Sequence, residues 1–486
     1  MSGILKRSMF GLALGSALLL HLFAAGGGAG GVSIQKAPEP ETSGKTGWDG
    51  VPAILARIKP PVFPTHDFPI TNFGAVGDGK TDCTAAIRKA IEACHAGRGG
   101  RVVVPAGTFL TGAIRLLSNV NLHVAEGSVL KFDPDPAKYL PAVYSRFEGV
   151  ECMNYSPLIY AFDQENVAIT GRGILDGSAS NENWWGWIRR SAGPPRAAAS
   201  VNRLREQADR GVPVRDRVFG QGHYLRPNFI EPYRCRNVFI EGITIRNSPM
   251  WEIHPALCTN VTVRGVTITS HGPNNDGCDP ESSRDVLIEN CVFDTGDDCI
   301  AIKSGRDKDG RRVGVPSENI VVRGCTMKDG HGGVVIGSEV SGNCRNVFVE
   351  NCRMDSPNLA RALRFKSNAR RGGIIEDVFM RKVEIGTLAE AVLTVDFLYE
   401  TGAEGPYPPV VRNVQLEDIT STSSPRVMYL AGFAGATIDD LRFTNCTFRG
   451  LTSNDVIQHA GSIVFRNVTV EPAKKVQSLN SRETLP

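Results

Sequence analysis

Apolar side chains recur at fixed offsets through the second half of the chain. Taken from nine anchors spaced 22 to 36 residues apart, the positions one, three, six and eight residues later are Val, Ile, Leu, Phe, Met or Cys in 35 of 36 cases. The anchors are Asn237, Asn260, Asp285, Asn319, Asn346, Asp377, Asn413, Asp440 and Ser462. Gly or Asn stands five residues after seven of them, and both tolerate the left-handed backbone of a sharp corner.

Each repeat therefore predicts two short strands joined at a tight bend, with alternate side chains pointing inward. Coils of this kind stack along an axis, so the sequence predicts an all-β fold, a right-handed single-stranded parallel β-helix. The alternative is a β-sandwich with regular turns, which predicts hairpin signals and no fixed phase. Cysteines at the sixth position are interpreted as core residues, although Cys325 and Cys352, in adjacent coils, could approach disulfide distance.

The ends of the chain differ in composition from this repeat. Lys6 and Arg7 precede an apolar run and a tract of small residues, which is typical of a secretory signal peptide; an uncleaved N-terminal anchor is the alternative. A short helix is expected near residues 53–58, and a helix over about 82–94 is expected to cap the N-terminal end of the β-helix. The predicted segments are a signal peptide (1–31), a linker (32–66), the β-helix domain (67–472) and a polar tail (473–486).

Charge is nearly balanced, with 54 basic and 51 acidic residues and a net charge of +3. That balance argues against a nucleic-acid-binding protein that relies on bulk positive charge. We therefore expect no nucleic-acid partner. From the predicted signal peptide we expect a secreted or periplasmic location with no membrane contact after signal cleavage, and we expect a monomer.

A second register runs through another strand of four coils, marked by Ser282, Ser304, Ser338 and Ser367. Two and four residues before these serines the side chains are apolar, apart from Pro280, so those positions are predicted to face inward. The outward positions on the same strands are charged: Asp279, Glu281, Lys303, Arg364 and Lys366. A charged face of this kind is unlike a packing surface. Arg364 and Lys366 imply an anionic substrate, or alternatively they neutralise nearby aspartates.

Acidic residues gather just before these strands. Asp276 and Asp298 lie six residues before two of the serines, and Asp297 and His331 lie seven before. Because coils lie about 4.8 Å apart, three carboxylates and one imidazole should form one patch. Like charges so close cannot all ionise freely, so at least one pKa should rise, which suits a general acid beside a general base. The alternative role for these aspartates is to cap turns.

These residues resemble the motifs of polygalacturonases, the pectin-cleaving glycoside hydrolases of family 28, and the resemblance covers roughly residues 68–470. The motifs stand in the family's order. They are Asn274-Asn275-Asp276, with the family's middle threonine replaced, Gly296-Asp297-Asp298-Cys299, Gly330-His331-Gly332 continuing into Ile336-Gly337-Ser338, Arg364-Phe365-Lys366, and Tyr399.

The resemblance implies hydrolysis, with inversion, of α-1,4-galacturonosidic bonds in polygalacturonate or oligogalacturonides, with no metal and no cofactor. It implies Asp297 as general acid, Asp276 and Asp298 as the residues that activate water, and His331 as the residue that tunes Asp297. Stacking of Asp276 over Asp298 at about 4.8 Å would by itself suggest a retaining pair, since inverting pairs are about 6.5–9.5 Å apart. Predicted substrate-binding residues are Asn274, Asp279, Lys303, Arg364, Lys366 and Tyr399.

The mode of cleavage depends on an insertion at residues 178–233, which contains Trp184, Trp185, Trp187 and nine arginines. We expect it to wall off one end of the cleft, so that the enzyme removes units from the non-reducing end; the alternative is a surface loop on the side wall. His331 favours homogalacturonan, because the resembling rhamnogalacturonan hydrolases lack that histidine. Other readings are an endo-polygalacturonase, a hydrolase of a substituted galacturonan, a calcium-dependent pectate lyase and a non-catalytic pectin-binding β-helix.

Overall fold

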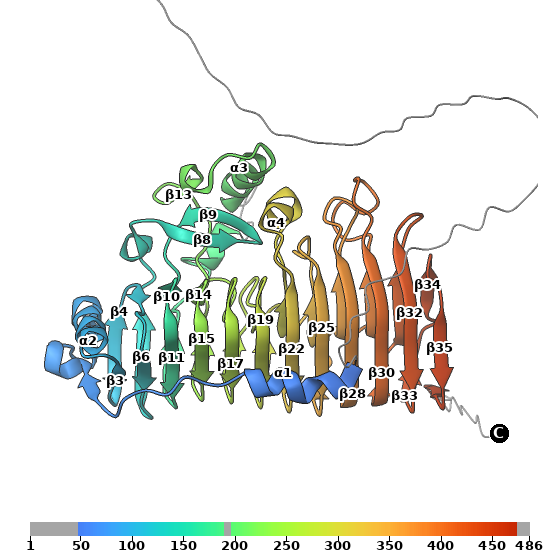
Figure 1. Cartoon of the computed structure of the whole chain (residues 1–486), viewed down its shortest axis with the longest axis horizontal. Coiled ribbons are helices and arrows are strands. Elements are labelled where there is room, and N and C mark those ends of the chain that lie inside the picture. The colour runs from blue at the N-terminus through green and yellow to red at the C-terminus, as the bar shows by residue number, and fades with distance from the viewer. Residues whose placement is uncertain (1–46, 189–195, 474–486) are drawn as a thin grey trace, which may run out of the picture. The chain divides into compact units, whose positions relative to one another are not determined.

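The chain winds into parallel coils that stack along one axis. The computed structural model describes residues 47–188 and 196–473, so the predicted signal peptide and polar tail lie outside the described residues, except for position 473. Equivalent residues of successive coils pair in parallel: Val238 stands beside Val261, and Val261 beside Val286. Figure 1 shows the strands side by side along this stack.

One extended sheet holds two strands of each coil on either side of a corner. Its N-terminal strands are β1 (Asp67–Pro69), β2 (Asp78–Asp82), β3 (Gly100–Val104), β4 (Gly107–Thr111), β6 (Val120–Val124), β7 (Ser128–Phe132), β11 (Glu165–Gly171) and β12 (Ile174–Asp176). Its later strands are β15 (Arg236–Glu241), β16 (Thr244–Arg246), β17 (Thr259–Arg264), β18 (Thr267–Ser270), β19 (Arg284–Glu289), β20 (Val292–Thr295), β22 (Ser317–Arg323), β23 (Thr326–Met327), β25 (Cys344–Glu350), β26 (Arg353–Met354), β28 (Ile374–Thr387), β30 (Val410–Ser423), β32 (Thr437–Thr444), β33 (Thr447–Leu451), β35 (Ile463–Arg466) and β36 (Thr469–Pro472).

A separate parallel sheet supplies the remaining strand of each coil. It contains β21 (Ile300–Ile302), β24 (Val334–Ile336), β27 (Arg361–Lys366), β29 (Ala391–Asp396), β31 (Arg426–Ala431) and β34 (Val456–Gln458). Isolated parallel bridges continue it through residues 278 and 253 to a three-stranded sheet of β5 (Ile114–Arg115), β10 (Ile159–Phe162) and β14 (Ile230–Tyr233). This face carries the charged positions of the second register.

Left-handed residues make the corners where the sequence predicts them. All nine residues five positions after the anchors have positive φ, including Lys382 (51°) and Asp418 (53°), which are neither Gly nor Asn. Anchor amides also bond from coil to coil: Asn237 Nδ2 donates to Asn166 Oδ1 at 2.8 Å, and Asn260 Nδ2 donates to Asn237 Oδ1 at 2.7 Å. The bends are thus fixed by both conformation and side-chain pairing.

The predicted inward positions form the core. From Val238 to Phe448 every one of them is at most 3% exposed, Ser421 included. The last coil is the exception, because no described coil covers it: Phe465 is 48% exposed and Val470 is 52% exposed. All twelve cysteines are buried free thiols, so Cys325 and Cys352 form no disulfide.

Ile320→Ala tests this core. Ile320 is fully buried in β22, so removal of its side chain should lower the free energy of unfolding by about 3 kcal/mol through lost burial and the cavity left behind. Ile374→Ala is the matched control, because Ile374 is 38% exposed, and it should change that free energy by less than about 0.5 kcal/mol. Urea unfolding followed by circular dichroism measures both; equal losses would contradict the assigned positions.

Helices cover one end and one side of the stack. Helix α2 (Thr84–Ala96) lies at the N-terminal end, where it packs Ile87 and Ile91 into the core (Figure 1). Helix α1 (Val51–Arg57) lies within the segment interpreted as a linker, yet it packs against the outer side of the extended sheet (Figure 1). Arg57 Nη2 pairs with Asp285 Oδ1 at 2.7 Å. The described part of that segment is therefore held on the domain.

Excursions rise from the coils on one side of the stack (Figure 1). They comprise an antiparallel hairpin of β8 (Val143–Phe147) and β9 (Val150–Asn154), helix α3 (Ala197–Asp209), strand β13 (Val218–Phe219), which pairs with β9, and helix α4 (Asp307–Val313).

Fully buried ion pairs attach these excursions. Arg146 Nη1 of the hairpin lies 2.7 Å from Glu281 Oε1, and Arg217 Nη1 lies 2.8 Å from Asp309 Oδ1. Removing one partner of such a pair leaves an uncompensated buried charge, which is strongly destabilising. Glu281, which the second register places on an outward face, is thus covered by the hairpin rather than open to solvent.

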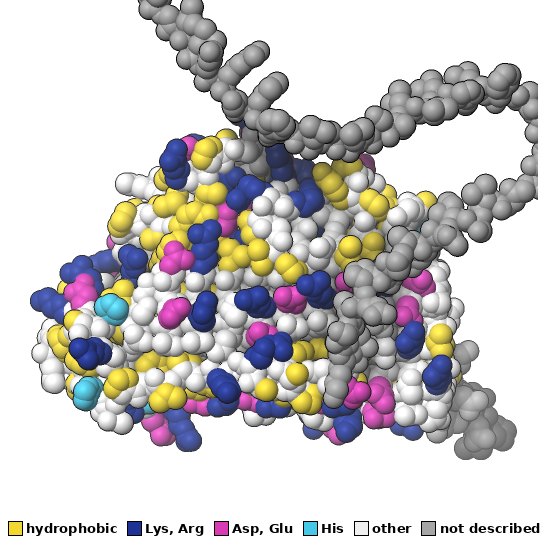
Figure 2. All heavy atoms as spheres, in the orientation of Figure 1, with side chains coloured by type: hydrophobic (Ala, Val, Ile, Leu, Met, Phe, Trp, Pro, Cys, Tyr) yellow, Lys and Arg dark blue, Asp and Glu magenta, His cyan; other side chains and the backbone are white. Residues whose placement is uncertain are grey.

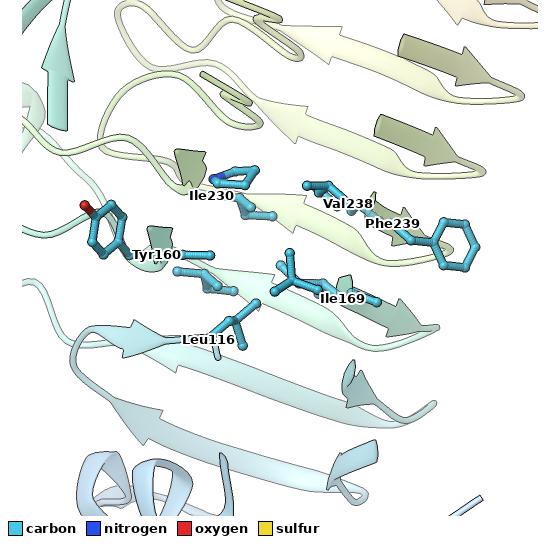
Figure 3. Close-up of a pocket in the computed structure, with 12 residues that line it drawn as sticks. Leu116, Tyr160, Ile169, Ile230, Val238 and Phe239 are labelled. Carbon is cyan, nitrogen blue, oxygen red and sulfur yellow. The ribbon is translucent and has the colours of Figure 1, made fainter. Parts of the chain in front are cut away.

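Charges of both signs are spread over one face of the stack, and the interior of the coils is tightly packed. Over the part of the face in Figure 2 that is not grey, basic and acidic side chains are interspersed. Inside the coils, Leu116, Ile169, Ile230 and Val238 surround a gap of only about 10 Å³ (Figure 3). Among the residues described, no helix is long and apolar enough to cross a membrane.

Candidate active site

A pocket of about 260 Å³ opens where the charged strands meet the excursions. Eight of the ten predicted site residues line it: Asn274, Asp276, Asp297, Lys303, His331, Arg364, Lys366 and Tyr399. The other two, Asp279 and Asp298, are fully buried directly behind the lining residues and are reached through their contacts with lysines. Residues more than 120 positions apart in sequence are therefore gathered at one place.

Three carboxyl groups cluster at the pocket, with Asp276 and Asp297 in its lining and Asp298 directly behind it. Asp276, Asp297 and Asp298 each bring one carboxylate oxygen within 4.8 Å of the other two. The parallel register produces this proximity, since Gly277 N–H bonds to the backbone oxygen of Asp298 at 2.9 Å. The close stacking expected from the repeat is what the structure has.

Lys303 compensates the charge around Asp276. Its Nζ lies 3.5 Å from Asp276 Oδ2, 3.3 Å from Asp279 Oδ1 and 3.5 Å from Glu339 Oε2, and it sits 4.3 Å from the ring centre of Trp251. Asp279, predicted to bind substrate, does not line the pocket; it contacts Lys303 instead. Burial raises the pKa of Asp279 to about 8 and raises the pKa of Asp276 well above its ordinary value, the latter with a further contribution from Asp297.

Asp297 pairs with the imidazole of the next coil. His331 Nδ1 lies 2.9 Å from Asp297 Oδ1, and the His331 side chain is 59% exposed. Burial acts to raise the pKa of Asp297, but the hydrogen bond from His331 and the charge of Lys366 outweigh it and lower that pKa to about 2. The same hydrogen bond raises the pKa of His331. The lowered pKa of Asp297 and the raised pKa of His331 therefore place the proton of this pair on the imidazole.

Asp298 is held by the two cations of β27. Lys366 Nζ donates to Asp298 Oδ2 at 2.6 Å, whereas Arg364 Nη1 is 3.9 Å from Asp298 Oδ1, too far for a hydrogen bond. Both cations lie under 6 Å from the ring centre of Tyr399, at 5.8 Å for Arg364 and 5.6 Å for Lys366. Arg364 thus keeps donors for a ligand, while Lys366 is engaged.

The lining also contains residues that the sequence patterns did not single out. They are Glu148, Arg205, Trp251, Arg306, Glu339 and Glu400; Ser338, a marker of the second register, also lines the pocket. Arg205 comes from α3 within the insertion, and its Nη2 donates to Glu148 Oε2 at 2.7 Å, at the tip of the hairpin. Arg306 Nη2 in turn donates to Glu400 Oε2 at 2.8 Å. Glu339 directly follows the register marker Ser338, and Trp251 is equivalent to Asp276 in the preceding coil, because residues 253 and 278 pair. Both could have been found from the repeat, whereas the other four come from segments without a period.

Two groups of side chains have the donor types and spacing of a metal site, within the part of the chain that the structure describes. One is the carboxylate trio of the pocket, and the other is His271 with Asp294 and Asp329, outside it. In the first group, Lys303 and Lys366 already supply positive charge.

Two family models match the chain. Glycosyl hydrolases family 28 matches residues 220–464, which is half of the chain and includes the whole carboxylate cluster. Rhamnogalacturonase A/epimerase, pectate lyase-like, matches residues 68–127 at the N-terminal end of the stack.

Proteins similar to this chain, one of them with a solved structure, are described as polygalacturonases or galacturonosidases. An exopolygalacturonase structure from Thermotoga maritima is 45% identical, has a TM-score of 0.83, and covers 87% of this chain and 95% of its own. The exo-poly-alpha-D-galacturonosidase of Dickeya chrysanthemi is 29% identical over 83% of this chain and 74% of its own length. A probable polygalacturonase of Vitis vinifera is 29% identical over 79% and 74%. The predicted right-handed parallel β-helix is confirmed by the parallel pairing together with these similarities.

Proposed function

The chain belongs to glycosyl hydrolases family 28, and on that premise we propose that it hydrolyses α-1,4-galacturonosidic bonds of polygalacturonate, releasing units from the non-reducing end. The observation that carries the proposal is the carboxylate trio: three oxygens lie within 4.8 Å of one another at a pocket that Arg364 and Lys366 also line. Hydrolysis of this bond requires a general acid and a general base that act on the same glycosidic bond, and cations that bind the carboxylate of the sugar.

Asp297 is proposed as the general acid. Its pKa of about 2 is opposite to what an acid needs, but His331 beside it carries the proton of the pair. A galacturonate carboxylate at the cations would offset the charge of Lys366, which is one of the causes of that low pKa. Substrate binding thus moves the proton toward Asp297 and the glycosidic oxygen.

Asp298 and Asp276 are proposed to hold the attacking water. Oxygens less than 4.8 Å apart suit one bridging water, since a water about 2.8 Å from each of two acceptors spans up to about 5.6 Å. Asp298 is the base, because it forms an ion pair with Lys366, whereas the raised pKa of Asp276 makes it a proton holder that orients the water. Attack on the side opposite Asp297 would invert the configuration at the anomeric carbon, as the family resemblance implies. The closest oxygens of the carboxyl groups, however, are nearer to each other than the distance of about 6.5–9.5 Å that is usual for an inverting acid and base.

Cleavage from the chain end is supported by the excursions. Glu148 of the hairpin, Arg205 of the insertion and Arg306 beside α4 line the same pocket as the catalytic carboxylates, which narrows the space for an internal segment of polymer. The exo-acting relatives from Thermotoga and Dickeya point the same way. We also propose export, on the basis of the N-terminal sequence pattern.

Product analysis tests the proposal. Trigalacturonate reduced at its reducing end should release free galacturonate first, and viscosity of polygalacturonate should fall slowly while reducing ends accumulate. Rapid loss of viscosity would mean endo cleavage. Unsaturated products that absorb ultraviolet light, together with activity that a chelator abolishes, would mean that the enzyme is a lyase. Proton NMR of the first anomer released distinguishes inversion from retention.

His331→Ala should shift the alkaline limb of kcat/KM to lower pH. In the wild type that limb reports loss of the proton from the Asp297–His331 pair, and the pKa of His331 is raised. Without the imidazole the pKa of Asp297 rises from about 2, yet it stays that of a carboxyl group, so the limb should fall by about one pH unit or more. Profiles on trigalacturonate from pH 3 to 9 measure it; an unmoved limb would remove His331 from the proton path.

A further inference from the structure

The turn that carries Asn274 is held by a side chain of the 178–233 insertion. Arg226 Nη1 donates to the backbone oxygens of Pro249 and Pro273, each at 2.7 Å. Its Nη2 donates to Asn274 Oδ1, also at 2.7 Å. Arg226 is only 1% exposed, so its guanidinium makes these contacts away from solvent.

The same insertion fixes the turn a second time. Trp185 Nε1 donates to the backbone oxygen of Ser248 at 2.8 Å, and its indole packs so closely on Gly272 that an added Cβ would lie 2.3 Å from it. Asn275, which is fully buried, accepts the Gly272 N–H at 2.8 Å. The position of the turn before Asp276 therefore depends on the insertion, although the two are far apart in sequence.

The contact with Arg226 decides which way the Asn274 amide points. A guanidinium has donors and no acceptor, so the Asn274 atom that faces it must be the oxygen. The Nδ2 amino group is then the end that remains for the pocket, and within the described residues it donates to no other group. Asn274 consequently offers a ligand a hydrogen-bond donor beside the carboxylates.

We propose that Arg226 is a positioning residue, which orients Asn274 so that its Nδ2 donates to a galacturonate oxygen in the pocket. The inference rests on the proposed function and deepens it, because it makes recognition of the sugar depend on the insertion. The charged donors beside the carboxylate trio, Lys303, Lys366 and His331, are paired with its carboxylates, whereas the Asn274 Nδ2 has no such partner among the described residues and is left for a ligand that carries acceptors.

A double-mutant cycle on kcat/KM for trigalacturonate tests it, with Arg226→Met, Asn274→Ala and the double variant. If Arg226 acts through Asn274, each single change should lower kcat/KM by about 30-fold, and the double variant should lie within about threefold of Asn274→Ala. Losses that multiply in the double variant, or a folded Arg226→Met with wild-type kcat/KM, would overturn the proposal. Wild-type enzyme without activity on any oligogalacturonide would instead mean that the proposed function fails.

Two further variants separate orientation from folding. Arg217→Met is the matched control, because Arg217 is an equally buried arginine of the insertion that contacts Asp309 and not the turn; its thermal stability should fall while kcat/KM per folded molecule stays within about threefold. Asn274→Asp keeps a partner for Arg226 but replaces the donor with an acceptor. It should be less active than Asn274→Ala, and wild-type activity in it would overturn the proposal.

Discussion

Asp297→Asn is expected to lower kcat on trigalacturonate by about 10³-fold to 10⁴-fold, with little change in KM, because an amide cannot protonate the leaving oxygen. The substitution is nearly isosteric, and the new Oδ1 still accepts from His331 Nδ1, which lies 2.9 Å from that position. Single-turnover kinetics with labelled trigalacturonate measure the chemical step directly. More than a tenth of wild-type kcat would remove Asp297 from the acid role.

Asp294→Asn is the matched control for that experiment. Asp294 belongs to the same coil, three residues before Asp297, but it pairs with His271 at 2.9 Å and does not line the pocket. Its kcat should stay within about threefold of the wild type. Thermal unfolding completes the comparison, because it shows whether both variants are folded at the temperature of the assay.

The carboxylate cluster could be predicted from the sequence because the repeat shows which residues of successive coils lie side by side. Equal offsets from Ser282, Ser304 and Ser338 become neighbouring positions once successive coils pair in parallel, and the pairing of β21 with β24 has that register. Composition and motifs then assigned chemistry to positions already known to be adjacent. The family assignment is confirmed by the matching model and the Thermotoga structure.

The positions of the excursions could not be predicted in this way, because their lengths and sequences follow no period. The outward face assigned to Glu281 holds for the strand, yet the hairpin folds over it and supplies Arg146 as its buried partner. Likewise, nothing in the sequence around Arg226 states that it reaches Asn274, 48 positions later. Contacts between an insertion and a repeat are set by packing in three dimensions, so they need coordinates.

Proton positions also lay beyond the sequence. Crowding predicts that one carboxyl pKa must rise, but the order of the shifts depends on distances of a few tenths of an ångström. Lys303 and Lys366 stand on neighbouring parts of the same face, and Asp297 has an additional partner in His331. The acid therefore has a low pKa, and we expect a bound galacturonate to raise it by offsetting the charge of Lys366.

Arg364→Gln should weaken binding of galacturonate by about 10-fold to 100-fold, because it removes a charge-assisted hydrogen bond to the sugar carboxylate. Arg364 suits that role: it is 9% exposed, lines the pocket and lies 3.9 Å from Asp298 rather than in hydrogen-bond contact with it. Binding of digalacturonate by calorimetry in the Asp297→Asn background gives Kd without turnover. The loss should appear in KM rather than kcat when the acid is intact.

The dimethyl ester of digalacturonate, in which both carboxylates are blocked, shows whether the lost interaction is with the carboxylate. Because the ester carries no charge, Arg364→Gln should change its Kd by less than about threefold, so the preference for acid over ester should collapse in the variant. Arg353→Gln supplies the matched control, since Arg353 lies on β26, pairs with Asp355 and is absent from the pocket; both ligands should bind it as they bind the parent. If acid and ester lose affinity equally in Arg364→Gln, then Arg364 shapes the pocket but does not bind the carboxylate. The preference for uronates must then come from Lys366.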